Sequence, residues 1–307
     1  MCVVGSINAD LVVRVDRLPR PGETRLAVDA VTLPGGKGGN QAVAAARVGA
    51  PTTFVGAVGT DAHADLLVAS LADEAVDTRH LRHAHGPSGL AVIEVDASGE
   101  NTILVVAGAN VTVSAGVVTS SVAAGAYEGC GVVLAQLEID VDAVQTAFAH
   151  ARAAGLRTIL NAAPGRVLPE DLVSVTDVLV VNETELLIAA AMAPEADDVT
   201  RSAALAALAR EVPIVVLTLG ADGARVVDEA GELRLPAVPV EPVDTVGAGD
   251  AFCGVLAASL AAGAPITEAV RRANAAGALA TTARGARSAP TATMLAELLS
   301  RRDAAPC

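Results

Sequence analysis

The sequence predicts an α/β protein built on a doubly wound, mainly parallel sheet, with a small antiparallel sheet attached to it. Apolar, β-branched segments alternate with Ala- and Leu-rich amphipathic segments along most of the 307 residues. Strands that are apolar throughout are typical of a parallel sheet that helices cover on both faces. Two regions break this alternation and read as extended chain, and we expect them to form the small sheet.

The elements follow in order from the N-terminus. The stretch CVVGSI after Met1 is the first expected strand, and a helix is expected from Asn40 to the glycine at position 49. The further expected strands are 52–59, 131–138, 157–164, 177–185 and 213–220. The further expected helices are 63–75, 142–155, 204–212, 250–263, 267–282 and 291–302.

The small sheet is expected from two segments, approximately 11–33 and 88–108. The first contains extended pieces around LPRPGE, and the second alternates around the turn DASGE, which predicts a β-hairpin. No internal repeat or long linker divides the sequence. We therefore expect one domain over residues 1–307, with these segments inserted as a lid or dimer surface.

Composition excludes several classes of protein. A net charge of −14 disfavours binding to nucleic acid. The longest apolar stretch, Ala251 to Ile266, is shorter than a membrane span and is expected to be a buried helix. The first residues do not resemble a signal peptide, and the four cysteines are widely spaced. We expect a cytoplasmic protein with reduced thiols and a core of Ala, Val and Leu.

A Gly-Ala-Gly turn precedes an Ala- and Leu-rich helix in the stretch DTVGAGDAFCGVLAASL, from Asp244 to Leu260. Free N–H groups at a helix N-terminus favour an anion, so Gly247, Ala248 and Gly249 could form an anion hole. Asp250 could serve as a general base beside it. An ordinary N-cap after a glycine turn is the structural alternative.

The segment GGKGGN contains Lys37, the only lysine of the sequence. Gly38 follows it where a P-loop would have Ser or Thr, so the P-loop pattern fails. Glycines here would let the backbone approach a small ligand closely. The alternative is a flexible turn that carries a solvated lysine.

Polar residues also follow several of the expected strands. Asn8 and Asp10 lie two residues apart, so their side chains share one side of an extended chain and could bind neighbouring hydroxyls of a polyol. Glu138 ends a later strand, at the edge where α/β sheets bind ligands. A turn of turn-forming residues is the alternative for the first pair.

Two further strand ends could hold a nucleotide. Asn182, Glu183 and Glu185 end one strand, and the glycine-rich segment 218–223 follows another. Amide and carboxylate groups at adjacent strand ends could bind phosphates or a water-coordinated Mg²⁺.

Taken together, these segments resemble the ribokinase/PfkB family of carbohydrate kinases. The similarity runs in order from GSINADLVVRVDRLPRPGE through GGKGGNQAVAAARVGA, AGAN, QLE, NAAP, NETE and TLGADG to DTVGAGDAFCG and ARGARSAP, and so covers almost the whole chain. The first family signature is complete, and the second departs only at Val255, where the family usually has Ala or Gly.

The resemblance implies a Rossmann-like domain with a β-sheet lid that often forms a dimer interface. It also implies transfer of the γ-phosphate of ATP to the 5-hydroxyl of D-ribose, giving D-ribose 5-phosphate and ADP. Asp250 would be the base, and Gly247, Ala248 and Gly249 the anion hole.

The remaining site residues are likewise implied by the resemblance. Sugar contacts would come from Asn8, Asp10, Gly36, Lys37, Gly38, Gly39, Asn40, Glu138 and Asp250. The nucleotide would contact Asn182, Thr218, Leu219, Gly220, Ala221, Asp222, Gly223, Gly249 and Asn274. An activating K⁺ would be bound by Asp244, Val246, Ala280, Ala283, Gly285 and Ser288, and Glu185 would organise Mg²⁺ through water.

Three alternatives stay open at this point. The chain could phosphorylate another sugar, deoxyribose above all, or a nucleoside, although a single Tyr, three Phe and no Trp leave few rings to stack on a base. It could also be a sensor that has lost the reaction. The intact Gly-Ala-Gly turn and Asp250 favour an enzyme.

Overall fold

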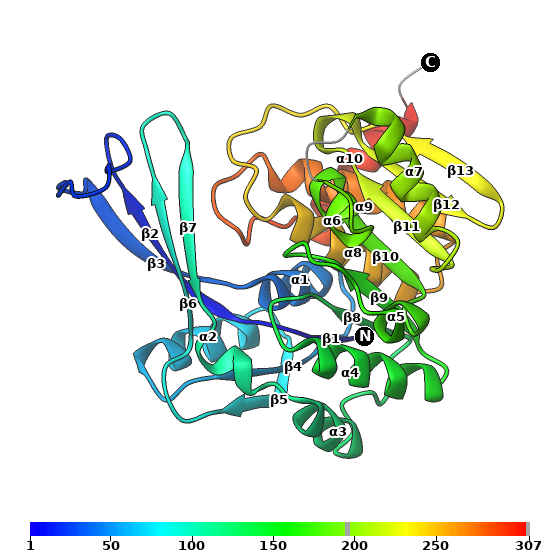
Figure 1. Cartoon of the computed structure of the whole chain (residues 1–307), viewed down its shortest axis with the longest axis horizontal. Helices are drawn as coiled ribbons and strands as arrows, with labels where there is room; N and C mark the ends of the chain where they lie inside the picture. Colours follow the sequence, from blue (N-terminus) through cyan, green and yellow to red (C-terminus); the bar gives the residue numbers. More distant parts are fainter. Residues whose placement is uncertain (194–196, 305–307) are drawn as a thin grey trace.

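A nine-stranded sheet organises the computed structural model, which describes residues 1–193 and 197–304. Its strand order is β13-β12-β11-β10-β9-β8-β1-β4-β5 (Figure 1). All neighbours are parallel except β11–β12 and β12–β13. The strands are β1 (Cys2–Val4), β4 (Thr53–Val58), β5 (Asp77–His83), β8 (Val132–Ala135), β9 (Arg157–Asn161), β10 (Val178–Asn182), β11 (Ile214–Thr218), β12 (Ala224–Asp228) and β13 (Gly231–Leu235). The prediction of a mainly parallel sheet is confirmed.

Helices cover both faces of this sheet. One face packs against α3 (Ala115–Ala123), α4 (Val141–Ala153), α5 (Glu170–Ser174), α6 (Glu183–Ala189) and α7 (Asp198–Leu208). The other packs against α1 (Lys37–Arg47), α2 (Ala62–Ala72), α8 (Ala248–Ala261) and α9 (Ile266–Ala280). A further helix, α10 (Ala292–Ala304), lies outside α8 and α9, where its Leu295 and Leu299 belong to the same hydrophobic cluster as the fully buried Val255. The position at which the family signature departs is therefore filled by core packing.

The alternation of side chains along each strand divides the core into these two halves. In β1, Val4 joins the cluster on one face, while Val3 joins the cluster on the other. Phe148 and Phe54 are the largest side chains that are fully buried, one in each half, and most of the remainder is Ala, Val and Leu. A core of small aliphatic side chains is what the composition predicts.

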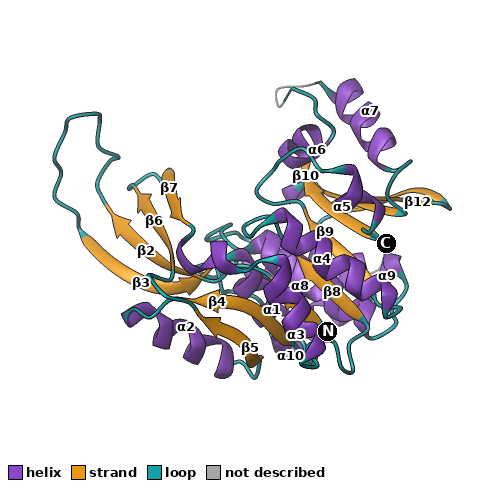
Figure 2. Cartoon of the chain, turned by 60° about the horizontal axis from the view of Figure 1, so that its bottom comes forward, coloured by secondary structure: helices purple, strands orange, loops and turns teal. Residues whose placement is uncertain are grey.

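A separate four-stranded sheet extends away from the main body (Figures 1 and 2). Its order is β3-β2-β6-β7, formed by β2 (Asn8–Arg14), β3 (Asp29–Gly35), β6 (Gly89–Val95) and β7 (Asn101–Val106). The expected hairpin around DASGE is the antiparallel pair β6–β7. The pair β2–β3 is also antiparallel, and β2–β6 is parallel. Two short 3₁₀ helices, η1 (Gly108–Thr112) and η2 (Gly220–Asp222), complete the elements.

Several boundaries differ from the sequence prediction. The helix expected from Asn40 begins at Lys37, because Gly36 adopts a positive φ of 82° and turns the chain into the helix there. The strand expected to continue to Glu185 ends at Asn182, since this residue caps α6. The hairpin β12–β13 and helices α3, α5 and α6 were not anticipated.

Two other expectations concern membranes and thiols. Within residues 1–193 and 197–304, the structure has no helix long and apolar enough to span a bilayer. Cys2, Cys130 and Cys253 are free thiols. Cys307, the fourth cysteine, lies outside the described residues.

Candidate active site

The candidate site forms where the N-terminal ends of α1 and α8 meet. The two helices approach closely because Gly254 has no side chain: a Cβ there would lie 2.4 Å from the carbonyl oxygen of Gln41 and 2.7 Å from Cβ of Ala44. This contact brings Asn40 and Gln41 beside Asp250 in the first turn of α8.

Two amides hold the Asp250 carboxylate, which is only 8% exposed. Asn40 Nδ2 donates to Oδ2 at 3.1 Å, and Gln41 Nε2 donates to Oδ1 at 2.9 Å. Burial raises the pKa of Asp250; Lys37 and the two amides oppose this rise. A carboxyl whose pKa is raised above its usual range is better suited to accept a proton from an alcohol.

The amide of Gln41 belongs to a buried network that the sequence analysis did not identify. Its Nε2 also donates to Asn161 Oδ1 at 3.0 Å, and its Oε1 accepts from Gln136 Nε2 at 2.6 Å. Gln41 follows Asn40 in the glycine-rich signature, and Asn161 ends β9 in the motif NAAP. In the sequence, the only signal for Gln41 and Asn161 was that they lie next to or within recognised motifs.

The Gly-Ala-Gly turn forms the N-terminus of α8. Gly247 is its N-cap with a positive φ of 79°, and a Cβ there would lie 2.2 Å from the carbonyl oxygen of Ala286. Glycine is therefore required both by conformation and by the close approach of the C-terminal loop. A Cβ on Gly249 would meet nothing within 4 Å, so the space beside this turn is open. The Ala248 N–H donates to the Thr245 carbonyl at 3.3 Å, and the Ala251 N–H is the first to donate within the helix, to the Gly247 carbonyl at 2.9 Å. The N–H groups of Gly249 and Asp250 lie between them without i−4 partners in the helix, as an anion site requires.

The GGKGGN segment is packed against the chain around β2, so the alternative of a flexible, solvated turn is wrong. A Cβ on Gly36 would lie 2.7 Å from the backbone nitrogen of Asn8, and one on Gly38 would lie 2.7 Å from backbone atoms of Ser6. Gly35 leaves room for the Asp10 carboxylate, from which a Cβ would be 2.0 Å. Gly39 lies in the first turn of α1 and is also buried.

The sugar-site candidates from β2 and from the loop after β8 lie beside this segment. Asn8 and Asp10 are buried, and Asn8 Oδ1 accepts from Asn110 Nδ2 at 2.7 Å. Glu138 Oε2 accepts from the backbone N–H of Lys37 at 3.1 Å and from the Ser6 hydroxyl. These contacts join β2, the loop after β8 and the start of α1 into one polar cluster.

Charges within this cluster perturb one another. Burial, with the carboxylates of Glu138 and Asp250 nearby, raises the pKa of Asp10 to about 7, against the opposing effect of Arg287. Burial by itself would lower the pKa of Lys37, but Asp250, Glu138 and then Glu185 raise it overall. The lone lysine is thus a partly buried cation among carboxylates.

Most of the expected nucleotide residues, Asn182 and residues 218–223, lie at the ends of β10 and β11. Asn182 and Glu185 form a capping box: Asn182 Oδ1 accepts from the Glu185 N–H at 2.8 Å, and Glu185 Oε2 accepts from the Asn182 N–H at 2.9 Å. Burial raises the pKa of Glu185, with the Asn182 N–H and Lys37 opposing. Glu185 therefore lies near the reacting groups, whereas Glu183 forms an ion pair with Arg201 at 3.6 Å.

The segment after β11 forms the other side of this region. Thr218 Oγ1 donates to the carbonyl of Val181 at 3.4 Å. Gly220, Ala221 and Asp222 form η2 after Leu219, and a Cβ on Gly223 would lie 2.1 Å from the carbonyl oxygen of Leu235. Asn274 of α9 donates to the same carbonyl at 3.5 Å. Residues that are distant in sequence thus meet near the ends of β10 and β11 in the large sheet.

Five of the six residues expected around K⁺ contact another member of the set. Asp244 Oδ2 accepts from the Gly285 N–H at 2.9 Å, and Asp244 Oδ1 accepts from the Val246 N–H at 3.0 Å. Ser288 Oγ donates to the Ala280 carbonyl at 2.8 Å. The exposed Ala283 lies on the same loop after α9. Carboxylate, hydroxyl and carbonyl oxygens are hard donors, so the set is chemically suited to an alkali cation.

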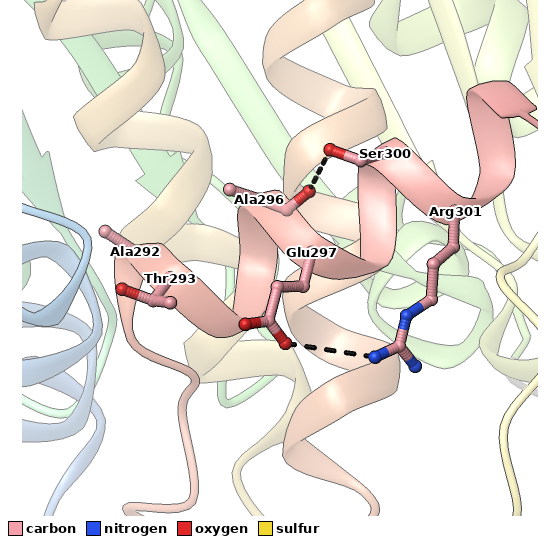
Figure 3. Close-up of a pocket in the computed structure, with 6 residues that line it drawn as sticks. All are labelled: Ala292, Thr293, Ala296, Glu297, Ser300 and Arg301. Atoms are coloured by element: carbon pink, nitrogen blue, oxygen red, sulfur yellow. Dashed lines mark hydrogen bonds and ion pairs between the residues drawn. The ribbon is translucent and has the colours of Figure 1, made fainter.

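A hollow over α10 is separate from this site (Figure 3). Three of its polar side chains are paired within the helix: Arg301 pairs with Glu297 at 3.9 Å, and Ser300 donates to the Ala296 carbonyl at 2.8 Å (Figure 3). We assign no chemistry to it.

A carboxylate held beside a helix N-terminus, in a cluster of hydroxyl-binding groups, suits phosphoryl transfer to an alcohol. This places the protein among the kinases of small polyols. The chain belongs to the pfkB family of carbohydrate kinases, whose model matches residues 1–293.

Individual relatives agree with this assignment. The chain is 38% identical to the ribokinase of Bacillus subtilis (strain 168) over 302 residues, which cover 98% of this chain and 99% of the relative. It is 32% identical to a deoxyribokinase of Salmonella typhi, with 99% of each chain covered. The structure of Arabidopsis thaliana ribokinase complexed with ribose and ATP matches with a TM-score of 0.86 at 33% identity, covering 97% of each chain.

Proposed function

We propose that the protein is a ribokinase, which transfers the γ-phosphate of ATP to the 5-hydroxyl of D-ribose and yields D-ribose 5-phosphate and ADP. The observation that carries this proposal is the buried Asp250 carboxylate, which Asn40 and Gln41 orient at the open N-terminus of α8. Ribokinases are relatives over nearly the full chain, and one has been seen with ribose and ATP.

In this mechanism Asp250 accepts the proton of the 5-hydroxyl as the oxygen attacks the γ-phosphate. N–H groups of the 247–249 turn stabilise the negative charge on the transferred phosphoryl group. Lys37, a cation among three carboxylates, lies where it can neutralise charge between sugar and phosphate. The fixed positions of these groups supply the catalysis, because phosphoryl transfer needs orientation and charge stabilisation more than covalent chemistry.

The sugar would bind to the polar cluster around β2 and α1. The Asp10 carboxylate and the Asn8 amide offer hydrogen-bonding groups from β2, and the glycines at 36 and 38 let the GGKGGN segment pack closely beside them. Asn40 and Glu138 complete the polar wall. The adenine nucleotide would bind at the edge formed by Asn182, Thr218, Leu219, Gly220, Ala221, Asp222, Gly223, Gly249 and Asn274.

Two metal ions accompany this proposal. Glu185 would hold a Mg²⁺ through water: Oε2 is engaged in the capping box, which leaves Oε1 for a metal-bound water. Magnesium would supply charge neutralisation on the ATP phosphates. The oxygen donors around Asp244 and Ser288 suit a K⁺ ion.

A prediction tests the K⁺ assignment. Ala286, in the loop that bears Gly285, packs against Gly247 of the anion hole. Binding of K⁺ to this loop should therefore order the turn at Gly247 and raise kcat. We expect higher activity in K⁺ than in Na⁺ or Li⁺ buffer, measured by ADP release, and loss of this difference in Asp244→Ala. Equal rates in all three salts would contradict the assignment.

The proposal also covers the domain organisation, the oligomeric state and the cellular location of the protein. Residues 1–307 would form one kinase domain, and the small sheet would close over the sugar as a lid. The exposed apolar side chains of β7 support a homodimer through this lid. The free thiols suit the reducing cytoplasm, where we place the enzyme.

The proposal is tested by a coupled ADP assay in K⁺ buffer over ribose, 2-deoxyribose, other pentoses, hexoses and nucleosides. Ribose should give the highest kcat/KM. Deoxyribose is the second candidate, because the deoxyribokinase relative matches over the full chain and the sugars differ by one hydroxyl. A higher kcat/KM on deoxyribose would replace the substrate assignment, and no ATP turnover with any sugar would refute a kinase.

A further inference from the structure

Arg287 reaches the site from the loop between α9 and α10, where the sequence analysis assigned it no role. Its Nε donates to Asn40 Oδ1 at 3.2 Å. Its Nη1 donates to the hydroxyl of Ser70 at 2.8 Å and to the Ser70 carbonyl at 3.4 Å. One guanidinium therefore joins the C-terminal loop to α1 and α2.

The Asn40 carboxamide lies between Arg287 and Asp250. Its oxygen accepts from the guanidinium, while its nitrogen donates to the Asp250 carboxylate at 3.1 Å. A half-turn of this amide would place its oxygen against the carboxylate and its N–H groups against the arginine, which is unfavourable on both sides. Both neighbours thus select the same orientation, and a charged hydrogen bond on each side is stronger than a neutral one.

The arginine is held tightly in this position. A Cβ on Gly39 would lie 2.9 Å from Nη2, so the guanidinium packs against the backbone of α1. Burial lowers the pKa of Arg287 to about 10, with the carboxylates of Asp10 and Glu74 opposing the fall. It therefore keeps its charge near neutral pH. Among the described residues, the buried Nη2 atom of Arg287 has no hydrogen-bond partner. A buried donor without a partner is unfavourable, so anchoring the loop does not by itself explain an arginine at this position.

A second arginine anchors the same loop without contacting Asn40. Arg47 Nη1 donates to the carbonyls of Arg287 and Ala289, at 2.6 and 2.9 Å, and Arg47 also pairs with Glu74. Loss of Arg47 would loosen the loop but leave the donor to Asn40 in place. It is therefore the matched control for a purely structural role.

We propose that Arg287 is a positioning residue of the phosphoryl-transfer site, which fixes the Asn40 carboxamide so that this amide holds the Asp250 carboxylate toward the acceptor hydroxyl. The inference rests on the proposed function for its kinetic consequence. The orientation of Asn40 is a property of the protein without substrate.

A double-mutant cycle measures the kinetic consequence. Arg287→Met should lower kcat on ribose about tenfold, the effect of losing a charge-assisted hydrogen bond. In an Asn40→Ala background the same change should cost less than about twofold, since the arginine then has no amide to orient. Arg287→Lys keeps the cation without the planar donor pair, and its kcat should fall between Met and wild type. If Arg287→Met lowers kcat by the same factor in the wild-type and Asn40→Ala backgrounds, the proposal is overturned.

Two further measurements separate positioning from folding. Arg47→Met should lower the melting temperature but keep kcat within about twofold, because the Asn40 contact survives. An equal fall of kcat in Arg47→Met and Arg287→Met would assign Arg287 a merely structural role. If Arg287→Met does not fold, the cycle is run with Arg287→Lys, whose smaller loss of kcat should likewise disappear in the Asn40→Ala background. An equal loss in both backgrounds would overturn the proposal.

The orientation itself can be observed without sugar or ATP. The side-chain amide of Asn40, assigned by its absence from the ¹⁵N–¹H spectrum of Asn40→Ala, should show two sharp, shifted resonances in wild type and in Arg47→Met. These should move toward free-amide positions and broaden in Arg287→Met and Arg287→Lys. Unchanged resonances in both Arg287 variants would refute the inference. Because this readout needs no turnover, its failure is distinct from failure of the ribokinase assignment.

Discussion

At the scale of single residues, Asp250 has two properties that oppose each other. Its carboxylate is buried, which destabilises the charged form, yet two amides and the nearby Lys37 favour that form. Burial prevails, so the pKa is raised. The folded protein therefore bears an unfavourable ionisation at neutral pH, and that cost is absent once Asp250 is protonated.

Replacement of Asp250 by Asn tests this balance. We expect kcat to fall about 10²- to 10⁴-fold, the usual contribution of a general base. The melting temperature should stay the same or rise, because the neutral amide relieves the cost of a buried charge. Activity assays and thermal unfolding of the same samples check both. A kcat within a few-fold of wild type would contradict the role of Asp250 as base.

Asp10 gives the site a pH dependence. Its pKa, about 7, lies above that of an unfolded aspartate, with burial and Glu138 as the leading causes and Arg287 opposing. Ionised Asp10 accepts hydrogen bonds from hydroxyls, so we expect ribose affinity to weaken as pH falls from 8 to 6. Calorimetric titration across this range measures the change, and Asp10→Asn should flatten it. Affinity independent of pH in wild type would contradict the prediction.

A fall in pH should change folding stability and ribose affinity in opposite directions. A carboxyl whose pKa is raised on folding destabilises the folded state above that pKa. For Asp10 this contribution disappears as pH falls through about 7 toward the unfolded value. The protein without sugar should therefore gain stability from this group over the same pH range in which it loses affinity.

At the scale of elements, the contact between α1 and α8 assembles the site. Neither helix carries the whole constellation: α1 supplies Asn40 and Gln41, and α8 supplies Asp250 and the anion hole. Their spacing is set at Gly254, where any side chain would meet backbone atoms of α1.

A methyl group at this contact should disturb both packing and chemistry. Gly254→Ala places a Cβ 2.4 Å from the Gln41 carbonyl oxygen, so the helices must separate. We expect the free energy of unfolding to fall by about 1–3 kcal/mol, as in other overpacked cores. The rate should fall as well, because the amides move away from Asp250.

The matched control is Gly116→Ala on α3, where a Cβ would meet only Ser114 Oγ at 3.8 Å. It should raise stability by up to about 1 kcal/mol through helix propensity. Denaturant unfolding and steady-state kinetics compare the two variants. An unaltered kcat in a folded Gly254→Ala protein would show that helix spacing does not set the site.

The sequence predicted which motifs matter better than it predicted how they contact one another. Hydrophobic patterning identified the parallel sheet, and the glycine-rich turns identified the helices α1 and α8, because these signals are local. The exact first residue of each helix was not predicted, since α1 begins at Lys37 and α8 at Ala248. The capping of α6 by Asn182 shortened a strand that apolar pattern alone extends to Glu185. The Gln41 network and the Arg287 contact join positions more than 90 residues apart, so no local pattern could show them.

At the scale of the whole molecule, the two sheets differ in how they are covered. The large sheet is packed against helices on both faces. The small sheet ends in the edge strand β7, where Ile103, Leu104, Val105 and Val106 are 50–66% exposed. An exposed apolar edge is a site for association, which natural proteins usually cover.

A second copy of the chain is the partner we expect on β7. Leu104→Asp places a charge on this strand. We expect wild type to be a dimer and this variant to be a monomer in sedimentation or light-scattering measurements at micromolar concentration. Because Leu104 is exposed, stability of the protomer should change by less than about 0.5 kcal/mol. Val199→Asp, at an exposed position on α7 away from the small sheet, is the control and should remain dimeric. A monomeric wild type, or a dimeric Leu104→Asp protein, would rule out this interface.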